Sequence, residues 1–166
     1  MSKKVIACSS LWTGTLVGLY TLLYLITPLG IAGVLPCTFV ALPIFLAGGG
    51  KREHLPGALG SAIAGVAWGA IFLSFQQWIA LRGVEPTQAA ALSVAIATAL
   101  LCAVHSLFTI KGLMSNIPMM FGAVACTFFV GLDKWPYTLL TLGFGIVLGY
   151  AISFSASLIQ QKMLKA

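Results

Sequence analysis

Charged residues divide this chain into long stretches that contain no charge at all. The uncharged stretches are residues 11–50, 55–81, 86–110, 112–132 and 135–161. A helix that crosses a bilayer needs about 20 predominantly apolar residues, so the first stretch is long enough for two crossings and each of the others for one. Charged residues make up 7% of the chain, against about 25% in soluble domains, and the mean hydropathy is +1.04. The sequence therefore predicts an integral membrane protein with six spans.

The predicted fold is an all-α membrane protein, a six-helix transmembrane bundle formed by a single integral membrane domain, residues 1–166. The expected spans are residues 11–27, 31–48, 57–79, 88–110, 113–131 and 136–158. The loops between these spans are short, so consecutive spans are expected to be antiparallel neighbours. Few residues remain for a soluble domain, and any function is expected to reside in the bundle.

The basic residues lie at the ends of the predicted spans and are unevenly shared between the two sides of the membrane. With the N-terminus inside, the cytoplasmic set is Lys3, Lys4, Lys51, Arg52, Lys111, Lys162 and Lys165, and the outer set is Arg82 and Lys134. Cytoplasmic loops are enriched in Lys and Arg, so both termini are predicted to be cytoplasmic. The net charge of +6 does not indicate nucleic acid, because such a surface needs its basic residues clustered on one face. The predicted partner is the lipid bilayer.

The first half of the sequence resembles the second half in two places. Residues 34–41 align with 116–123, matching a proline, a phenylalanine and an alanine, and this proline alignment also pairs Gly49 with Gly131. At a slightly different offset, the glycine alignment pairs residues 65–69 with 145–149. Two halves of three spans each, residues 1–82 and 83–166, would have opposite orientations, which is the 3+3 inverted repeat seen in many transporters. Accidental matches between apolar segments are the alternative.

Three pairs of glycines lie four residues apart within the predicted spans. The pairs are Gly14 and Gly18, Gly65 and Gly69, and Gly145 and Gly149. This spacing lets two helix backbones approach closely in lipid. We expect helix packing within one chain first, and contacts between subunits second. Because six helices barely enclose a pore, a homo-oligomer is also expected.

Three prolines interrupt the second and fifth predicted spans. They are Pro36, Pro43 and Pro118. A proline inside a helix removes a backbone donor and kinks the helix. Two kinked spans side by side would form a solute site of the kind found at broken helices. The alternative is an ordinary proline-kinked helix near a loop.

The fourth predicted span has one face of small and polar side chains. Ala91, Ala95, Thr98, Cys102, His105 and Thr109 share this face at steps of three or four residues, and Ile96, Leu100, Val104 and Phe108 occupy the opposite face. The candidates for lining a path are therefore Thr98, Cys102, His105 and Thr109. His105 would gate the path or relay protons. The alternative is a neutral histidine that is hydrogen-bonded to a neighbouring helix.

Three apolar motifs stand out: PIFLAGG at residues 43–49, IPMMFG at 117–122 and GIVLG at 145–149. With them, the chain resembles an uncharacterised family of bacterial inner-membrane proteins typified by YcdZ. The resemblance covers nearly the whole chain. It implies a six-span protein of the bacterial inner membrane, and it brings no catalytic or ligand-binding residues.

No Asp, Glu, Lys or Arg lies within a predicted span, whereas proton relays and many ion-coupled transporters use carboxylates at membrane depth. The sequence therefore favours a facilitator or channel for a small neutral or weakly charged solute that is not ion-coupled. The alternative is a non-transporting accessory or structural membrane subunit. The sequence contains no nucleophile–base pair, metal-ligand cluster or cofactor motif, and its four cysteines have no CxxC spacing. No cofactor, metal or enzymatic activity is expected.

Overall fold

The computed structural model describes residues 3–108 and 112–165, and in these residues the fold is all-α. The α-helices are α1 (Lys3–Ile26), α2 (Pro28–Ile31), α3 (Pro36–Ala47), α4 (Leu55–Ala80), α5 (Pro86–Phe108), α6 (Ile117–Val130) and α7 (Trp135–Lys165). Two short 3₁₀ helices, η1 (Arg52–His54) and η2 (Leu132–Lys134), precede α4 and α7. The chain thus twice has the order short α-helix, 3₁₀ helix, long α-helix.

Four of the described helices, α1, α4, α5 and α7, are long and apolar enough to cross a membrane. The helices in the second and fifth predicted spans are shorter than expected, because α3 has 12 residues and α6 has 14. At a rise of about 1.5 Å per residue, neither reaches the roughly 30 Å of a hydrocarbon core. Four of the described helices, rather than six, therefore have full spanning length.

Two of the three prolines start helices instead of kinking them. Pro36 and Pro118 lie in the first turns of α3 and α6, where a helix needs no backbone N–H donor. The prediction that these two residues are kinks was wrong. Pro43 does lie inside α3, as expected.

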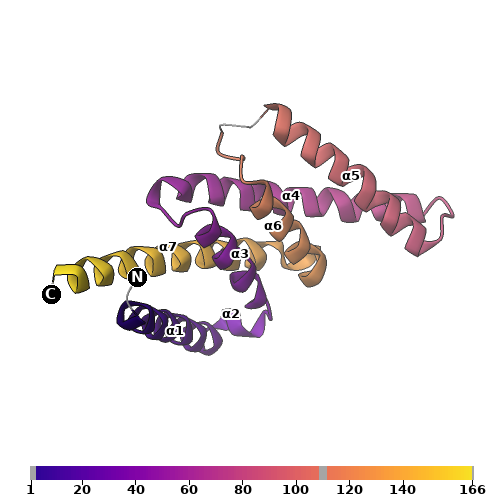
Figure 1. Cartoon of the computed structure of the whole chain (residues 1–166). Coiled ribbons are helices and arrows are strands. Elements are labelled where there is room, and N and C mark those ends of the chain that lie inside the picture. The colour runs from indigo at the N-terminus through magenta and orange to yellow at the C-terminus, as the bar shows by residue number, and fades with distance from the viewer. Residues whose placement is uncertain (1–2, 109–111, 166) are drawn as a thin grey trace.

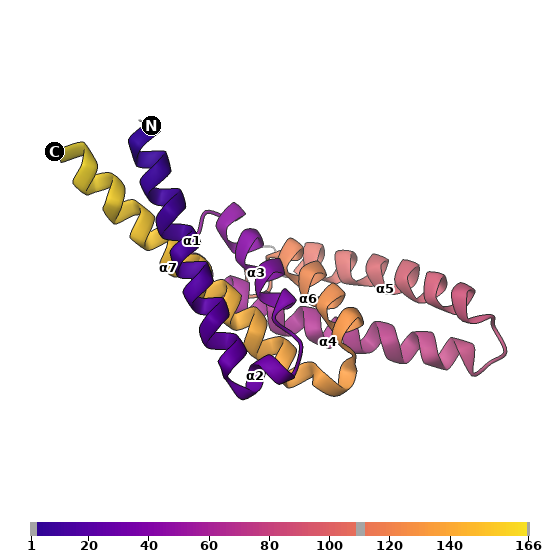
Figure 2. The same ribbon diagram turned by 90° about the horizontal axis from the view of Figure 1, so that it is seen from below.

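The long helices form two pairs, with the short helices between them. Helix α1 packs beside α7, and α5 packs beside α4. Figure 1 and Figure 2 show α3 and α6 at the centre, between the two pairs, with both termini at the same end of the molecule. Helix α3 contacts α7, while α6 contacts α4, so each short helix packs on the long helix that follows the other short helix.

Glycines make these two crossings close. A Cβ atom at Gly65 of α4 would lie 2.5 Å from the carbonyl oxygen of Met120 in α6. One at Gly145 of α7 would lie 2.6 Å from the carbonyl oxygen of Thr38 in α3. Gly69 and Gly149 face α6 and α3 in the same way. These four predicted packing glycines therefore contact a neighbouring helix within the chain.

The first glycine pair behaves differently. Among the described residues, no atom lies within 4 Å of a Cβ placed at Gly14 or Gly18 of α1, so this pair makes no close crossing there. Helix α1 is instead attached by hydroxyl groups: Tyr20 Oη lies 2.7 Å from Thr38 Oγ1, and Tyr24 Oη lies 2.8 Å from Thr141 Oγ1. Polar groups inside a membrane protein need such partners, because lipid offers none.

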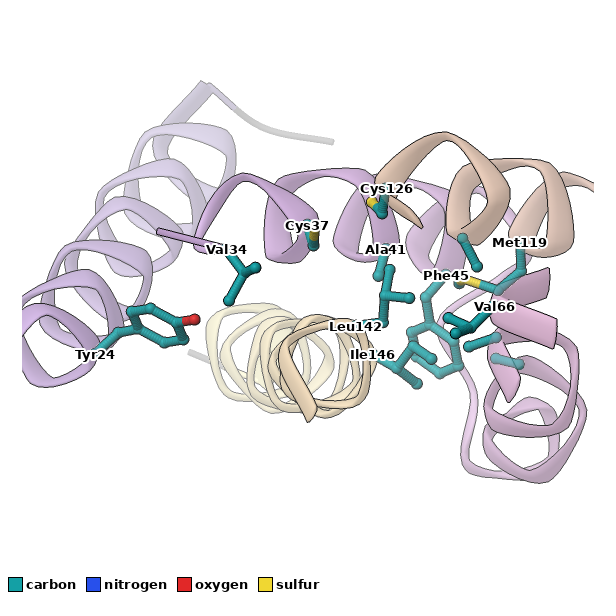
Figure 3. Close-up of a cluster of buried hydrophobic side chains, with 13 residues drawn as sticks. Tyr24, Val34, Cys37, Ala41, Phe45, Val66, Met119, Cys126, Leu142 and Ile146 are labelled. Atoms are coloured by element: carbon teal, nitrogen blue, oxygen red, sulfur yellow. The ribbon is translucent and has the colours of Figure 1, made fainter. Parts of the chain in front are cut away.

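The core lies where α3, α4, α6 and α7 meet. Figure 3 shows Phe45, Val66 and Met119 together, with Leu142 and Ile146 beside them. All but Val66 are at most 1% exposed. These side chains hold the two short helices against the two long ones.

Helix α5 begins at the end of the molecule that is far from the termini. The carboxylate of Glu85 orders the loop before this helix. Glu85 accepts hydrogen bonds from the backbone N–H of Gln88 and from the hydroxyl of Thr87. Hydrogen bonds to the charged form of a carboxyl favour that form, so the backbone N–H groups of Thr87 and Gln88, together with the Thr87 hydroxyl, lower the pKa of Glu85. Glu85 therefore caps the first turn of α5 as an anion.

We expect Gly65→Ala and Gly145→Ala each to destabilise the folded protein by about 1–3 kcal/mol, the usual cost of overpacking a tight contact. The added methyl group meets a backbone carbonyl, which cannot turn away as a flexible side chain can. Thermal unfolding in detergent measures the change. Gly57→Ala, on the same helix as Gly65, is the matched control because its methyl group meets no described atom within 4 Å, and equal melting temperatures for all three variants would contradict the role of the crossings.

Candidate functional site

A cavity of about 680 Å³ lies at the end of the bundle where α4 begins and α6 begins. It is bordered by the end of α3, by η1 and the first turn of α4, and by the segment that leads into α6. Its lining residues are Phe45, Gly48, Glu53, His54, Pro56, Gly57, Ala58, Gly112, Leu113, Ser115, Asn116 and Pro118. Figure 1 shows the connection from α3 to α4 on the same side of the molecule as the two termini.

The wall formed by the start of α6 is built by an asparagine cap. The backbone N–H of Met119 donates to Asn116 Oδ1 at 3.0 Å, which caps α6. The backbone N–H of Asn116 in turn donates to Ser61 Oγ of α4 at 3.0 Å. A capping side chain satisfies a helix-end N–H that would otherwise lack a partner. Asn116 is therefore fixed at the cavity wall from two sides.

Close packing beside this wall again depends on glycine. The segment before α6 lies so near α4 that a Cβ atom at Gly60 would meet the carbonyl oxygen of Leu113. At Gly57, about one turn earlier on α4, a Cβ atom would have no described atom within 4 Å. The segment is thus packed at Gly60, and the cavity opens at Gly57.

The mouth of the cavity carries opposite charges. Glu53 Oε1 lies 3.7 Å from Lys51 Nζ and 3.7 Å from His54 Nε2. These side chains are exposed, so the pairs contribute little stability. The inner end is apolar, because Phe45 there is 1% exposed and belongs to the same core as Met119. The cavity is therefore a polar vestibule that is closed behind by the core.

The sequence matches the family described as "Protein of unknown function (DUF1097)" over residues 10–157. This range includes every residue that lines the cavity. The chain belongs to the DUF1097 family. No curated protein and no solved structure matches the chain. Membership in DUF1097 and the apolar helices together indicate a membrane protein, and they assign no residue roles.

The predicted path-lining residues of this DUF1097 chain lie elsewhere, on α5. Thr98 and Cys102 are partly buried there, and His105 is buried. None of the three lines the cavity, and Thr109 falls outside the described residues. The residues of α5 that are buried repeat every fourth position: Ala89, Ser93, Ala97, Leu101 and His105. The buried stripe is thus rotated from the predicted face and shares only His105 with its polar candidates.

His105 is bonded to the neighbouring helix. Trp68 Nε1 of α4 donates to His105 Nε2 at 2.9 Å, and the two rings pack edge to face at 6.2 Å between centroids. A ring nitrogen that accepts a hydrogen bond carries no proton, so this contact requires the tautomer protonated at Nδ1. Nearer the start of α5, Ser93 Oγ donates to the carbonyl oxygen of Phe72 at 2.7 Å. The polar groups of α5 therefore attach α5 to α4.

Sequence analysis singled out none of the polar lining residues Glu53, His54, Ser115 and Asn116. A usable signal was present in the fifth predicted span. Asparagine two residues before a proline, followed by an apolar run, is typical of a helix start. Read in this way, residues 113–116 precede a helix and are free to line a cavity.

We expect His105→Leu and Trp68→Phe each to destabilise the protein by about 1–3 kcal/mol, because each leaves a polar partner unsatisfied among helices. The double variant should cost clearly less than the sum of the two. Thermal unfolding of all four proteins forms the required double-mutant cycle. Additive losses would mean that the Trp68–His105 bond does not couple α4 to α5.

Proposed function

We propose that this DUF1097 chain is a membrane facilitator for a small neutral or weakly charged solute, working without ion coupling. One observation supports this most strongly: two helices too short to cross the bilayer meet at a cavity with polar walls. Non-helical backbone at membrane depth is tolerated where it is buried in protein or lines a water-filled cavity. Short helices that end at such a cavity are the arrangement of transporter solute sites.

We further propose that the chain is a 3+3 inverted repeat. The glycine alignment pairs Arg52, where η1 begins, with Leu132, where η2 begins, and likewise pairs the starts of α4 and α7. The proline alignment pairs Gly49 with Gly131, and both have positive φ angles, 103° and 92°. This agreement in backbone conformation supports the repeat, because positive φ at equivalent positions is not expected from shared apolar composition.

The glycine crossings support the same repeat. Gly65 faces Met120 and Ala123. The glycine alignment pairs Gly65 with Gly145, and the proline alignment pairs Met120 with Thr38 and Ala123 with Ala41. Gly145 faces Thr38 and Ala41. In this proposal the six helices α1, α3, α4, α5, α6 and α7 make six passes, with α3 and α6 completing theirs through the non-helical segments beside them.

The composition of the cavity favours a neutral solute with both hydrogen-bond donors and acceptors. Ser115 and Asn116 offer hydroxyl and amide groups, while Glu53 and His54 lie at the mouth. No acidic or basic residue lies within the central part of any described helix of full spanning length. Coupling to protons or sodium commonly uses such residues. We therefore propose that the solute moves down its own concentration gradient.

The proposed setting is the bacterial inner membrane, with both termini in the cytoplasm and the cavity open to the cytoplasm. Among the described residues, Lys and Arg lie mainly at the end that holds the termini, in agreement with the positive-inside rule. A homo-oligomer remains part of the proposal, since Gly14 and Gly18 of α1 have no close neighbour among the described residues. Nucleic acid, cofactors and enzymatic activity are not part of it.

The rival function is a non-transporting accessory or structural membrane subunit. The core behind the cavity favours it, because Phe45, Met119 and Leu142 are at most 1% exposed and close the way to the other end. A facilitator must rearrange this region to pass a solute. A structural subunit would keep it as it is.

We expect a cysteine at position 51 to react with a charged, membrane-impermeant thiol reagent only from the cytoplasmic side. A cysteine at position 82 should react only from the outside, because Arg82 lies in the loop between α4 and α5. Labelling of intact and permeabilised cells compares the two sides, in a background without the exposed Cys8. Reaction of position 51 in intact cells would reverse the proposed orientation.

We expect proteoliposomes with the wild-type chain to admit urea, acetamide or glycerol faster than protein-free liposomes, without a proton or sodium gradient. Gly57→Trp should reduce this flux to the protein-free background, because the indole fills the cavity. Leu100→Trp is the control, since it places the same side chain on the exposed side of α5, away from the cavity. Stopped-flow light scattering measures the flux. No flux for any probe would favour the structural subunit, and a strict gradient requirement would exclude uncoupled transport.

A further inference from the structure

The proposed repeat assigns a counterpart to the cavity at the other end of the bundle. The glycine alignment pairs Gly57 and Ala58 of the cavity with Tyr137 and Thr138 of α7. The proline alignment pairs Phe45 with Thr127, and Asn116 with Val34. Thr127, Thr138 and Val34 are all 0% exposed. Phe45 and Ala58 of the open cavity are themselves 1% exposed, so the two ends differ at the third pair, in which Val34 is completely buried and Asn116 is only partly buried. The counterpart location is therefore filled at Val34, whereas the first location is open at Asn116.

The filling comes from one short segment. Residues 27–34, which we call the lid, contain α2 and connect α1 to α3. Leu29 and Ala32 of the lid pack against the core, and Val34 is part of it. The lid turns tightly on the end of α1, where a Cβ atom at Gly30 would lie 2.6 Å from the carbonyl oxygen of Leu25. Beyond that turn it is loosely held, because α2 has four residues, none of them buried, and Ile31 is 90% exposed. Gly33 has a φ of +71°, which permits a sharp turn at its end.

A hydrogen bond from a charged group attaches the lid to the opposite half. Lys134 Nζ of η2 donates to the carbonyl oxygen of Ala32 at 3.2 Å. The residue equivalent to Lys134 is His54, which borders the open cavity and lies 3.7 Å from Glu53 Oε1. The two ends thus differ at the same position of the repeat: a lysine bridges to the lid at one end, and a histidine lines an open mouth at the other.

We propose that the lid covers a second solute site, and that Lys134 is its latch. The site would be lined by the hydroxyl groups of Thr127 and Thr138, which are now covered, and it would take the same class of ligand as the cavity, a small neutral solute with hydrogen-bond donors and acceptors. This proposal rests on the proposed function. In a facilitator with an inverted repeat, the two halves exchange roles around one solute position, so the lid opens when the first cavity closes.

The test uses one reporter cysteine at each end. Gly57→Cys reports the open cavity, and Thr138→Cys reports the covered site. Cys8 and Cys102 are replaced by alanine, and the buried Cys37 and Cys126 are kept, with the reporter-free protein as the background. A charged thiol reagent should label Gly57→Cys quickly and Thr138→Cys slowly. Lys134→Met should raise the labelling rate of Thr138→Cys at least tenfold and lower that of Gly57→Cys.

Two controls separate the latch from a general loss of structure. Lys162→Met removes the same charge near the end of α7, away from both reporters, and should leave both labelling rates unchanged, whereas Lys134→Arg keeps a donor and should keep Thr138→Cys slow. If Lys134→Met does not give folded protein, Gly57→Trp provides the second variant, because filling the first cavity should also speed labelling of Thr138→Cys.

The outcomes distinguish this inference from the proposed function. Solute flux with Thr138→Cys unreactive in every background would overturn the second site and leave the facilitator intact. Faster labelling in Lys134→Met, without flux of urea, acetamide or glycerol in any protein, would support the lid and overturn the facilitator. Equal acceleration at both reporters would mean general unfolding and would also overturn the latch.

Discussion

The close contact between each short helix and a glycine-bearing long helix is the constraint on which the rest of the structure depends. In lipid there is no hydrophobic force to drive one apolar helix against another, so association relies on close packing and hydrogen bonds. Gly65 and Gly145 let α6 and α3 approach until backbone atoms are nearly in contact. Once both short helices are held in this way, the segments that precede them form the cavity wall at one end and the lid at the other.

The same contact explains why the short helices tolerate being short. The N–H groups at the start of a helix have no partner within it, and lipid cannot provide one. In α6 the side chain of Asn116 satisfies one of them, and Ser61 of α4 accepts the N–H of Asn116 itself. In α3 the N–H of Cys37 donates to the carbonyl oxygen of Val34, and the hydroxyl of Thr38 donates toward the carbonyl oxygen of Thr141 in α7. Each start is therefore tied to a long helix by hydroxyl groups.

The sequence predicted the long helices well and the short ones poorly, for a physical reason. A run of apolar residues indicates membrane depth, and the predicted spans 57–79 and 136–158 lie within α4 and α7. It does not indicate where within that run the backbone is helical. Proline has two meanings in such a run: inside a helix it produces a kink, and in the first turn it starts the helix. Pro36 and Pro118 have the second meaning, and only the residues before them distinguish the two.

The candidate site was harder still to predict, because polarity is a weak guide to burial in a membrane protein: Leu101 is completely buried, while Leu100 is 53% exposed. The predicted face of α5 was chosen by its small and polar residues and was therefore rotated from the buried face. The hydrogen bond from Trp68 to His105 agrees with the alternative of a neutral histidine attached to a neighbouring helix.

The contacts also differ in the free energy needed to break them, and this difference identifies the part of the molecule that can move. The glycine crossings bring backbone atoms into close contact, and separating them is expensive. The lid is held by a few apolar contacts and by the hydrogen bond from Lys134, and a bond from a charged group contributes about 1.5–3 kcal/mol. A minor conformation with a population of about 0.1–10% requires a free-energy difference of a few kcal/mol. The energy that holds the lid is therefore of the size that permits reversible opening, and the tightly crossed helices supply the fixed frame against which it opens.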